Sequence, residues 1–239
     1  MRVVKMRTGL LAVLILLLGS EGFAQRRKVL NLPNYDKQTV HFGFILGINS
    51  LNFIYRPVDD LRQNDTVMAI TPGSGNGFNL GIVSNLHLSD NFDFRFLPTL
   101  TFGERKLTYT LKVAGTDSSF LRDKNVESVF LEFPVLLKFK SARANNFRAY
   151  VTGGIKPVID LASQDKVDDK GEKILKLKRN DINWEIGVGL DIYTQYFKFT
   201  PELKMAYGMK NLLVRDNNMY INPLDRLRSK AMYISFTFE

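Results

Sequence analysis

The sequence has no cysteine, and its 239 residues include one tryptophan and two histidines. Without cysteine the chain can form no disulfide bond, offer no thiol nucleophile and carry no lipid on an N-terminal cysteine. It also lacks a glycine-rich phosphate-binding loop and the usual spacings of metal ligands. These absences exclude lipoproteins, disulfide-rich secreted domains and several classes of enzyme.

Long apolar runs are also scarce. No segment approaches the roughly 18 apolar residues that would suggest a membrane-spanning helix. Residues 1–24 have instead the features of a secretory signal peptide, with basic residues up to Arg7, a short apolar core at Leu10–Leu18 and small residues in Gly22–Ala24. We predict cleavage after Ala24. An uncleaved anchor is the alternative, for which the apolar core is short.

The chain is basic, with a formal net charge of +9. A basic balance suits nucleic acid, anionic lipopolysaccharide or acidic proteins, so charge alone does not decide between them. Lysine and arginine are spread along the chain rather than gathered in one block. We predict lipid and lipopolysaccharide as partners, and no nucleic acid, cofactor or small-molecule substrate.

What the sequence does contain is strict alternation. From Asp181 to Tyr193 every second residue, from Ile182 to Ile192, is apolar, and the residues between are polar or glycine. Successive side chains of a strand point to opposite faces, so the segment predicts a strand with one apolar face. The pattern recurs in eight segments, at 42–48, 78–88, 92–105, 129–140, 151–159, 181–193, 197–209 and 232–238.

The connections between these segments alternate in length. We predict long connections at Arg56–Gly75, Ala114–Asn125, Asp165–Arg179 and Asn211–Arg228, and short turns at Ser89–Asn91, Ala142–Asn146 and Thr194–Gln195. Bacterial outer-membrane barrels have an even number of strands, short periplasmic turns and longer external loops. The sequence therefore predicts an all-β fold, an eight-stranded antiparallel transmembrane β-barrel of OmpA or OmpX size.

This interpretation divides the chain into a signal peptide (1–24), a tail (25–38) and the barrel (39–239). An even strand number places both mature termini in the periplasm and the protein in the outer membrane. The tail shows no periodicity and begins with Arg26, Arg27 and Lys28. The chain ends in Phe236, Phe238 and Glu239, which resembles the terminal signal that barrel-assembly machinery recognises, although an ordinary last strand would look the same.

The polar strand faces favour a membrane barrel over a soluble one. Charged residues lie opposite the apolar positions, and we expect them in the lumen: Arg95, Glu132, Lys138, Lys156, Glu185, Asp191, Lys198, Glu202 and Lys204. The apolar residues would face lipid, among them Ile182, Trp184, Phe197, Phe199, Ile234 and Phe236. Eight strands enclose an interior that side chains just fill, so we expect no wide pore.

Two finer expectations follow from this orientation. If Thr194-Gln195 is a two-residue hairpin turn, Asp191 lies across from Lys198 and Glu185 across from Lys204. Leu190→Arg should impair folding far more than Asp191→Asn, because a lipid-facing Arg near the bilayer midplane costs about 2–4 kcal/mol.

Catalytic or metal-binding chemistry gets little support. His41 and His87 have inward parity at the same end of adjacent strands, so a paired site is conceivable, but two ligands fall short of a usual metal site. We expect them to form hydrogen bonds near the barrel mouth. A lipid-modifying enzyme would need a polar cluster at the opposite end. We therefore predict no catalytic, cofactor-binding or metal-binding residues and no enzymatic activity.

Several segments, in order along the chain, resemble the PorT family, outer-membrane proteins of the type IX secretion system and gliding machinery of Bacteroidetes. The segments are His41–Phe44, Arg95–Pro98, Phe102–Arg105, Leu131–Pro134, Gly153–Lys156, Glu185–Gly187, Gly189–Asp191, Pro201–Lys204 and Phe236–Glu239. The resemblance implies a role in exporting substrates with a C-terminal sorting domain. It supplies no catalytic residues.

Because the barrel is narrow, the resemblance implies an accessory or assembly role beside a larger translocon and other, unidentified secretion proteins. The accessible regions for such partners would be the basic tail and the loops at Arg56–Gly75 and Asp165–Arg179. A general structural or adhesion barrel of OmpX type is the alternative. It would show protruding strands and no secretion defect on deletion.

Overall fold

The computed structural model describes residues 29–58, 67–112, 118–163, 175–215 and 220–239. The chain separates into two compact units, Met1–Leu30 and Asn31–Glu239, and the fold described below is that of the second. The expected signal peptide and the three basic residues at 26–28 lie outside the described residues. Within these ranges, no helix is both long and apolar enough to cross a membrane.

Strands make up nearly all of the second unit. They are β1 (Val40–Pro57), β2 (Val67–His87), β3 (Phe92–Phe96), β4 (Thr99–Lys112), β5 (Ser119–Glu132), β6 (Val135–Lys140), β7 (Phe147–Asp160), β8 (Asn180–Tyr193), β9 (Lys198–Gly208) and β10 (Leu224–Phe238). A short 3-10 helix, η2 (Tyr35–Lys37), precedes β1.

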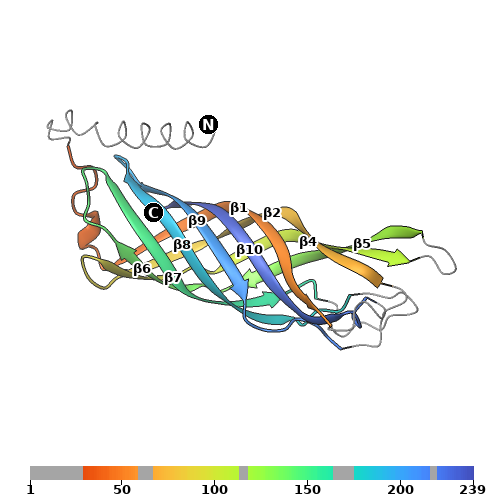
Figure 1. Ribbon diagram of the computed structural model, residues 1–239. Helices are drawn as coiled ribbons and strands as arrows, with labels where there is room; N and C mark the ends of the chain where they lie inside the picture. The colour runs from red at the N-terminus through yellow and green to blue at the C-terminus, as the bar shows by residue number, and fades with distance from the viewer. Residues whose placement is uncertain (1–28, 59–66, 113–117, 164–174, 216–219) are drawn as a thin grey trace, which may run out of the picture. The chain divides into compact units, whose positions relative to one another are not determined.

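The strands form one closed antiparallel ring. β2 pairs with both β3 and β4, these pair with β6 and β5 respectively, and β5 and β6 both pair with β7. β1 closes the ring on β10, with Leu46 opposite Phe236. The segments β3 and β4 are two parts of one barrel strand, and β5 and β6 are two parts of the next. The predicted eight-stranded antiparallel barrel is therefore confirmed, and Figure 1 shows its tilted strands.

Two prolines explain the interruptions. Pro98 separates β3 from β4, and Pro134 separates β5 from β6. Proline has no backbone N–H for the ladder, so it is confined to edges and bulges. The two breaks lie side by side, because the Leu97 backbone N–H donates to the Pro134 carbonyl oxygen at 3.1 Å. This pairing keeps the ring closed across both breaks.

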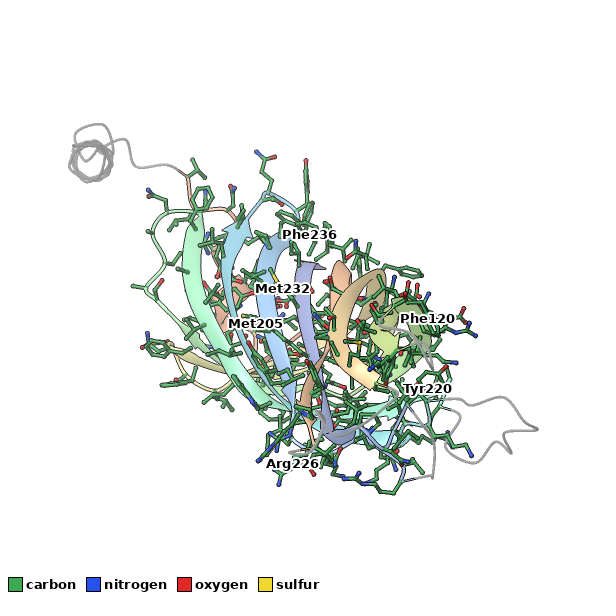
Figure 2. The ribbon with its side chains drawn as sticks, turned by 45° about the vertical axis from the view of Figure 1, so that its right-hand side comes forward. Phe120, Met205, Tyr220, Arg226, Met232 and Phe236 are labelled. Carbon is green, nitrogen blue, oxygen red and sulfur yellow. The ribbon has the colours of Figure 1, made fainter. Side chains whose placement is uncertain are left out.

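The two faces of the barrel have the predicted polarity. The outward positions carry large exposed apolar side chains, such as Phe42 (71% exposed), Ile186 and Val188. All nine charged residues that were expected in the lumen are buried. Figure 2 shows outward side chains on β9 and β10, including Met205, Met232 and Phe236. The assignment of lumen and lipid faces is therefore correct.

The strands at the end with the long connections are longer than predicted. β1 continues to Pro57 and β2 begins at Val67, so most of the expected Arg56–Gly75 loop is strand. Residues Ser119–Asn125 of the second predicted long connection lie in β5, and β10 already begins at Leu224. In Figure 1 the β4–β5 hairpin reaches furthest at this end, which we call the long-loop end.

The predicted register between β8 and β9 is wrong by two residues. Tyr193 lies opposite Lys198, and Gly187 lies opposite Lys204. The turn has four residues rather than two, because the Thr194 N–H donates to the Phe197 carbonyl oxygen and the Thr194 hydroxyl donates to that same oxygen. Glu185 still lies near Lys204, with 3.7 Å between Oε1 and Nζ, but Asp191 pairs with Lys138.

A second core lies at the long-loop end. Its buried side chains are apolar: Phe53, Val67, Ile70, Leu107, Tyr109, Leu111, Leu175, Leu177, Leu212, Leu213, Tyr220, Ile221, Leu224 and Leu227. We call this cluster the apolar cap. Leu175 and Leu177 belong to the run Asp165–Arg179 that was expected to be a solvated loop. That expectation is wrong for these two residues, while residues 164–174 lie outside the described residues.

Candidate functional site: the filled lumen and its two ends

In the half of the lumen nearer the long-loop end, a network of ion pairs and hydrogen bonds surrounds Lys156, a fully buried residue of β7. Its Nζ lies 3.3 Å from Glu132 Oε2 and 3.0 Å from Glu185 Oε2. The same Nζ donates to the Tyr233 hydroxyl at 2.9 Å, and that hydroxyl donates to Glu132 Oε1 at 2.8 Å. One cation thus joins strands on opposite sides of the barrel. A buried charge is tolerated only with such compensation.

The middle of the lumen contains two further ion pairs. Lys138 Nζ donates to both carboxylate oxygens of Asp191, at 2.7 and 2.9 Å. Arg95 Nη1 lies 3.4 Å from Glu202 Oε1, and its Nη2 lies 3.6 Å from the terminal residue Glu239. The last residue of the chain therefore takes part in the packing of the lumen.

Arg105 marks the boundary between the polar lumen and the apolar cap. Its Nη2 donates to Asp160 Oδ2 at 3.1 Å, and its Nε donates to Ser128 Oγ at 2.9 Å. The guanidinium also stacks over Phe53 and Phe130, with 4.6 and 4.8 Å to the ring centroids. Arg105 joins the two cores because it combines charge pairing with stacking on aromatic faces.

Glycines on the inner face make room for these long side chains. A Cβ on Gly189 would come within 2.3 Å of the Tyr150 hydroxyl oxygen. A Cβ on Gly187 would come within 2.8 Å of Lys204 Cγ. Side chains from opposite walls fill the lumen.

The short-turn end of the barrel is covered by residues of the expected tail. Asp36 accepts hydrogen bonds from Arg148 Nη1 and Nη2, both at 3.1 Å, and from the Tyr193 hydroxyl at 2.9 Å. The Tyr35 hydroxyl donates to Glu239 Oε2 at 3.0 Å. Burial and the nearby Glu239 carboxylate raise the pKa of Tyr35 well above its usual value. Residues 31–38 therefore close this mouth and do not form a free tail.

Both histidines lie at this end, as predicted, but they serve different contacts. His41 Nε2 lies 2.8 Å from the Tyr35 carbonyl oxygen, and its ring stacks on Tyr35 with 4.0 Å between centroids. His87 Nδ1 lies 3.0 Å from Asp93 Oδ1, which also pairs with Lys140 at 2.6 Å. Among the described residues, no group of three His, Asp or Glu side chains could hold a metal ion.

The charged side chains of the lumen connect strands across the barrel interior. Each histidine or carboxylate discussed above is engaged in a structural contact. The long-loop end holds the apolar cap, in which the Tyr109 hydroxyl donates to the Tyr220 carbonyl oxygen at 3.0 Å. Sequence reasoning missed this cap. The sequence feature that could have revealed it is a set of apolar residues at inward-facing positions, Phe53, Leu107 and Leu227. They show that the strands extend beyond their lipid-facing part.

The family model described as "Outer membrane protein beta-barrel domain" matches residues 23–214. No curated protein matches the chain significantly. Among solved structures, Neisserial surface protein A shares 10% identity and a TM-score of 0.42, covering 84% of this chain and 98% of that one. OprG from Pseudomonas aeruginosa shares 13% identity and a TM-score of 0.43, covering 84% and 93% respectively.

Proposed function

The chain belongs to the outer membrane protein beta-barrel domain family, and we propose that it is an accessory or assembly component of the type IX secretion system. In this role it supports the export of substrates with C-terminal sorting domains. The resemblance to PorT proteins, which runs through nearly all strands, supports the secretion role. Gliding motility, with which the PorT resemblance also associates this machinery, belongs to the same proposal.

The filled lumen is the observation that most favours an accessory role. Lys156, Arg95 and Lys138 are buried, and each is paired with carboxylates from other strands. An unfolded or folded protein substrate could not pass without breaking all of these pairs. The protein therefore acts beside a translocon, and its surfaces, not its interior, carry the function.

We propose that the barrel is exported by a signal peptide cleaved after Ala24, with both mature termini in the periplasm. Short turns of outer-membrane barrels face the periplasm, which places the closed short-turn end there and the apolar cap outside. The basic residues Arg26, Arg27 and Lys28 then remain available to periplasmic partners. These placements can be tested because the natural chain has no cysteine.

Single-cysteine labelling tests the orientation. Lys112→Cys, at the end of β4, should react with a membrane-impermeant maleimide in intact cells. Ser89→Cys, in the turn between β2 and β3, should react only after the outer membrane is permeabilised. The opposite labelling pattern would reverse the proposed topology.

The secretion role is tested by deleting the gene. Cargo with a C-terminal sorting domain should accumulate in the periplasm, while the purified barrel should conduct little in planar bilayers. Complementation with the natural gene should restore export. Normal cargo export in the deletion strain would contradict the secretion role.

One observation favours a second candidate, a structural or adhesion barrel of OmpX type. The strands β4 and β5 extend beyond the lipid-facing band, and Phe120 and Leu121 are exposed at their tip. Protruding strands are what this alternative predicts. The deletion experiment separates the two functions, because an adhesion barrel would leave cargo export unchanged while lowering surface attachment.

A further inference from the structure

The outward face of the pair β1 and β10 changes character along its length. Near the short-turn end it carries Ile48, Ile234 and Phe236, which are exposed and apolar. Towards the long-loop end the same face of β10 carries Lys230, Arg228 and Arg226 at every second position. Figure 2 shows Phe236, Met232 and Arg226 in this order along β10.

The basic residues form a compact group. Across the ladder, Arg226 lies opposite Arg56, and Arg228 lies opposite Ile54. Residues two apart on a strand are separated by about 7 Å, so one anionic headgroup can span neighbouring cations. We call Arg56, Arg226, Arg228 and Lys230 the basic seam.

The cations of the basic seam are not fully neutralised by the protein. Asp225 lies 3.9 Å from Arg56 and 3.6 Å from Arg226, and it also contacts Arg215. In the described part of the chain, Arg228 and Lys230 have no carboxylate within ion-pair distance. Cations set side by side without counter-charges attract an anionic group.

A groove on the lipid-facing surface adjoins the basic seam on the side nearer the short-turn end. It has a volume of about 340 Å³, and its lining includes Ile48, Ser50, Gly77, Met232 and Ile234. Ser50 and Gly77 are the small residues of this lining. Gly77 cannot gain a side chain, because a Cβ there would come within 1.9 Å of the Phe102 carbonyl oxygen. The groove is mainly apolar and of a size that suits a hydrocarbon chain.

An aromatic pair shows the depth of this site in the membrane. Trp184 stacks on Tyr207 with 4.8 Å between ring centroids, and Tyr207 lies opposite Lys230 in the ladder. Lys230 Nζ lies 5.8 Å from the Tyr207 ring centroid. Tryptophan and tyrosine gather at the headgroup level of membranes. Lys230 therefore lies at the boundary between headgroups and acyl chains.

We propose that the basic seam and the groove together bind a phosphorylated, acylated lipid of the outer leaflet, of the lipid A type. The cations Arg228 and Lys230 hold its phosphate, and one acyl chain lies in the groove between β1, β2 and β10. This inference depends on the long-loop end facing outwards. It is independent of the secretion role, since a structural barrel would bind the same lipid.

The test measures the affinity of the purified full-length barrel for lipid A in neutral detergent micelles, by fluorescence displacement and native mass spectrometry. Arg228→Gln with Lys230→Gln should weaken binding by roughly 25-fold, since each basic side chain near an anionic lipid surface contributes about a factor of five. The matched control is Lys112→Gln with Arg122→Gln, which removes the same charge from the β4–β5 hairpin. It should bind like the natural protein.

Two further measurements separate the phosphate contact from the acyl contact. Dephosphorylated lipid A should bind the natural barrel as weakly as lipid A binds the seam variant. Ser50→Phe, which fills the groove and leaves the charge unchanged, should weaken lipid A but leave inorganic phosphate binding unaltered. Equal affinity of the natural, seam and groove proteins would overturn the proposal. So would an equal loss in the control variant, because it would indicate a non-specific charge effect.

Discussion

The membrane-level part of the barrel and its long-loop end are built on opposite principles. At membrane level the outward positions are apolar and the enclosed ones charged, as Val188 outside and Lys156 inside illustrate. At the long-loop end the enclosed positions are apolar, as in Leu107, and many outward ones are polar or charged, as in Arg226 and Asp123. The same strands pass through both regions. In β1 the inward residues change from Asn49 to Leu51 and Phe53.

The difference shows that the surroundings of a strand, not its alternation, decide which face is apolar. Lipid outside removes the need for an apolar core, so the enclosed face can be charged if every charge is paired. Water outside restores the need to bury apolar area, which is worth roughly 25 cal/mol per Å². The two regions should therefore respond differently to the same kind of substitution.

The largest expected effect is in the polar lumen. Lys156→Met would leave Glu132 buried without its cation and Glu185 with Lys204 alone, which costs about 3–5 kcal/mol of unfolding free energy. Urea unfolding in lipid vesicles can be followed through Trp184, the only tryptophan in the chain. Lys112→Met, on the exposed end of β4, is the control and should change little. A loss below about 1 kcal/mol for Lys156→Met would show that the lumen is not held by paired charges.

The next effect concerns the apolar cap. Leu107 is fully buried there, and Leu107→Ala should cost about 2–5 kcal/mol, as for other large-to-small changes in an apolar core. The loss would appear as faster proteolysis of the long-loop end and a lower urea midpoint. Leu121→Ala, at an exposed position on β5, should have almost no effect. Equal behaviour of the two variants would mean that the cap is not a packed core.

The third effect depends on depth in the membrane. Val188→Arg puts a charge near the middle of the lipid-facing part of β8 and should cost about 2–4 kcal/mol, whereas Leu190→Arg, nearer the short-turn end, should cost less. Leu121→Arg, beyond the membrane, should cost nothing measurable. The yield of folded, heat-modifiable barrel after refolding gives this order directly. A flat response across the three positions would contradict the assigned membrane band.

The structure also changes one expected contrast. Asp191→Asn was expected to be mild beside Leu190→Arg, but Asp191 accepts two hydrogen bonds from Lys138 Nζ and one from the Thr200 hydroxyl. Neutralising Asp191 leaves a buried ammonium group without its counter-charge. We therefore expect both variants to be impaired, and Leu121→Arg is the better control for Leu190→Arg.

The sequence predicted the membrane-level region well because lipid imposes a simple rule on every strand there. Alternation located the eight strands, and parity placed Arg95, Glu185 and Lys204 in the lumen. It could not predict the apolar cap. Strands were recognised by an apolar outward face, and Arg56–Gly75 has polar outward residues, so this segment was interpreted as a loop. The four-residue turn at Thr194–Phe197 was missed because its hydrogen bonds depend on the Thr194 side chain.

The ion pairs that cross the lumen also could not be predicted from the sequence. Asp191 pairs with Lys138 from β6 and Arg95 pairs with Glu202 from β9, although neither pair of strands is adjacent in the ring. Such contacts depend on how far long side chains reach across a narrow interior. The closure of the short-turn mouth by Tyr35 and Asp36 has the same origin, since nothing periodic marks that segment.

The smallest expected effect on stability comes from comparing one aspartate–arginine ion pair at each end of the barrel. Asp36 and Asp225 each contact arginines, but Asp36 lies against the largely buried Arg148, while Asp225 and its partners are exposed. Asp36→Asn should cost about 1–3 kcal/mol, because it weakens charge-assisted hydrogen bonds to a side chain that cannot turn to water. Asp225→Asn should cost close to zero, as exposed ion pairs usually do. Hydrogen exchange of residues 31–38 measures the local effect, which should be large for Asp36→Asn and absent for Asp225→Asn. If the hydrogen-exchange protection of residues 31–38 is the same in both variants, the mouth is closed by the stacking of Tyr35 on His41 and not by the Asp36 carboxylate.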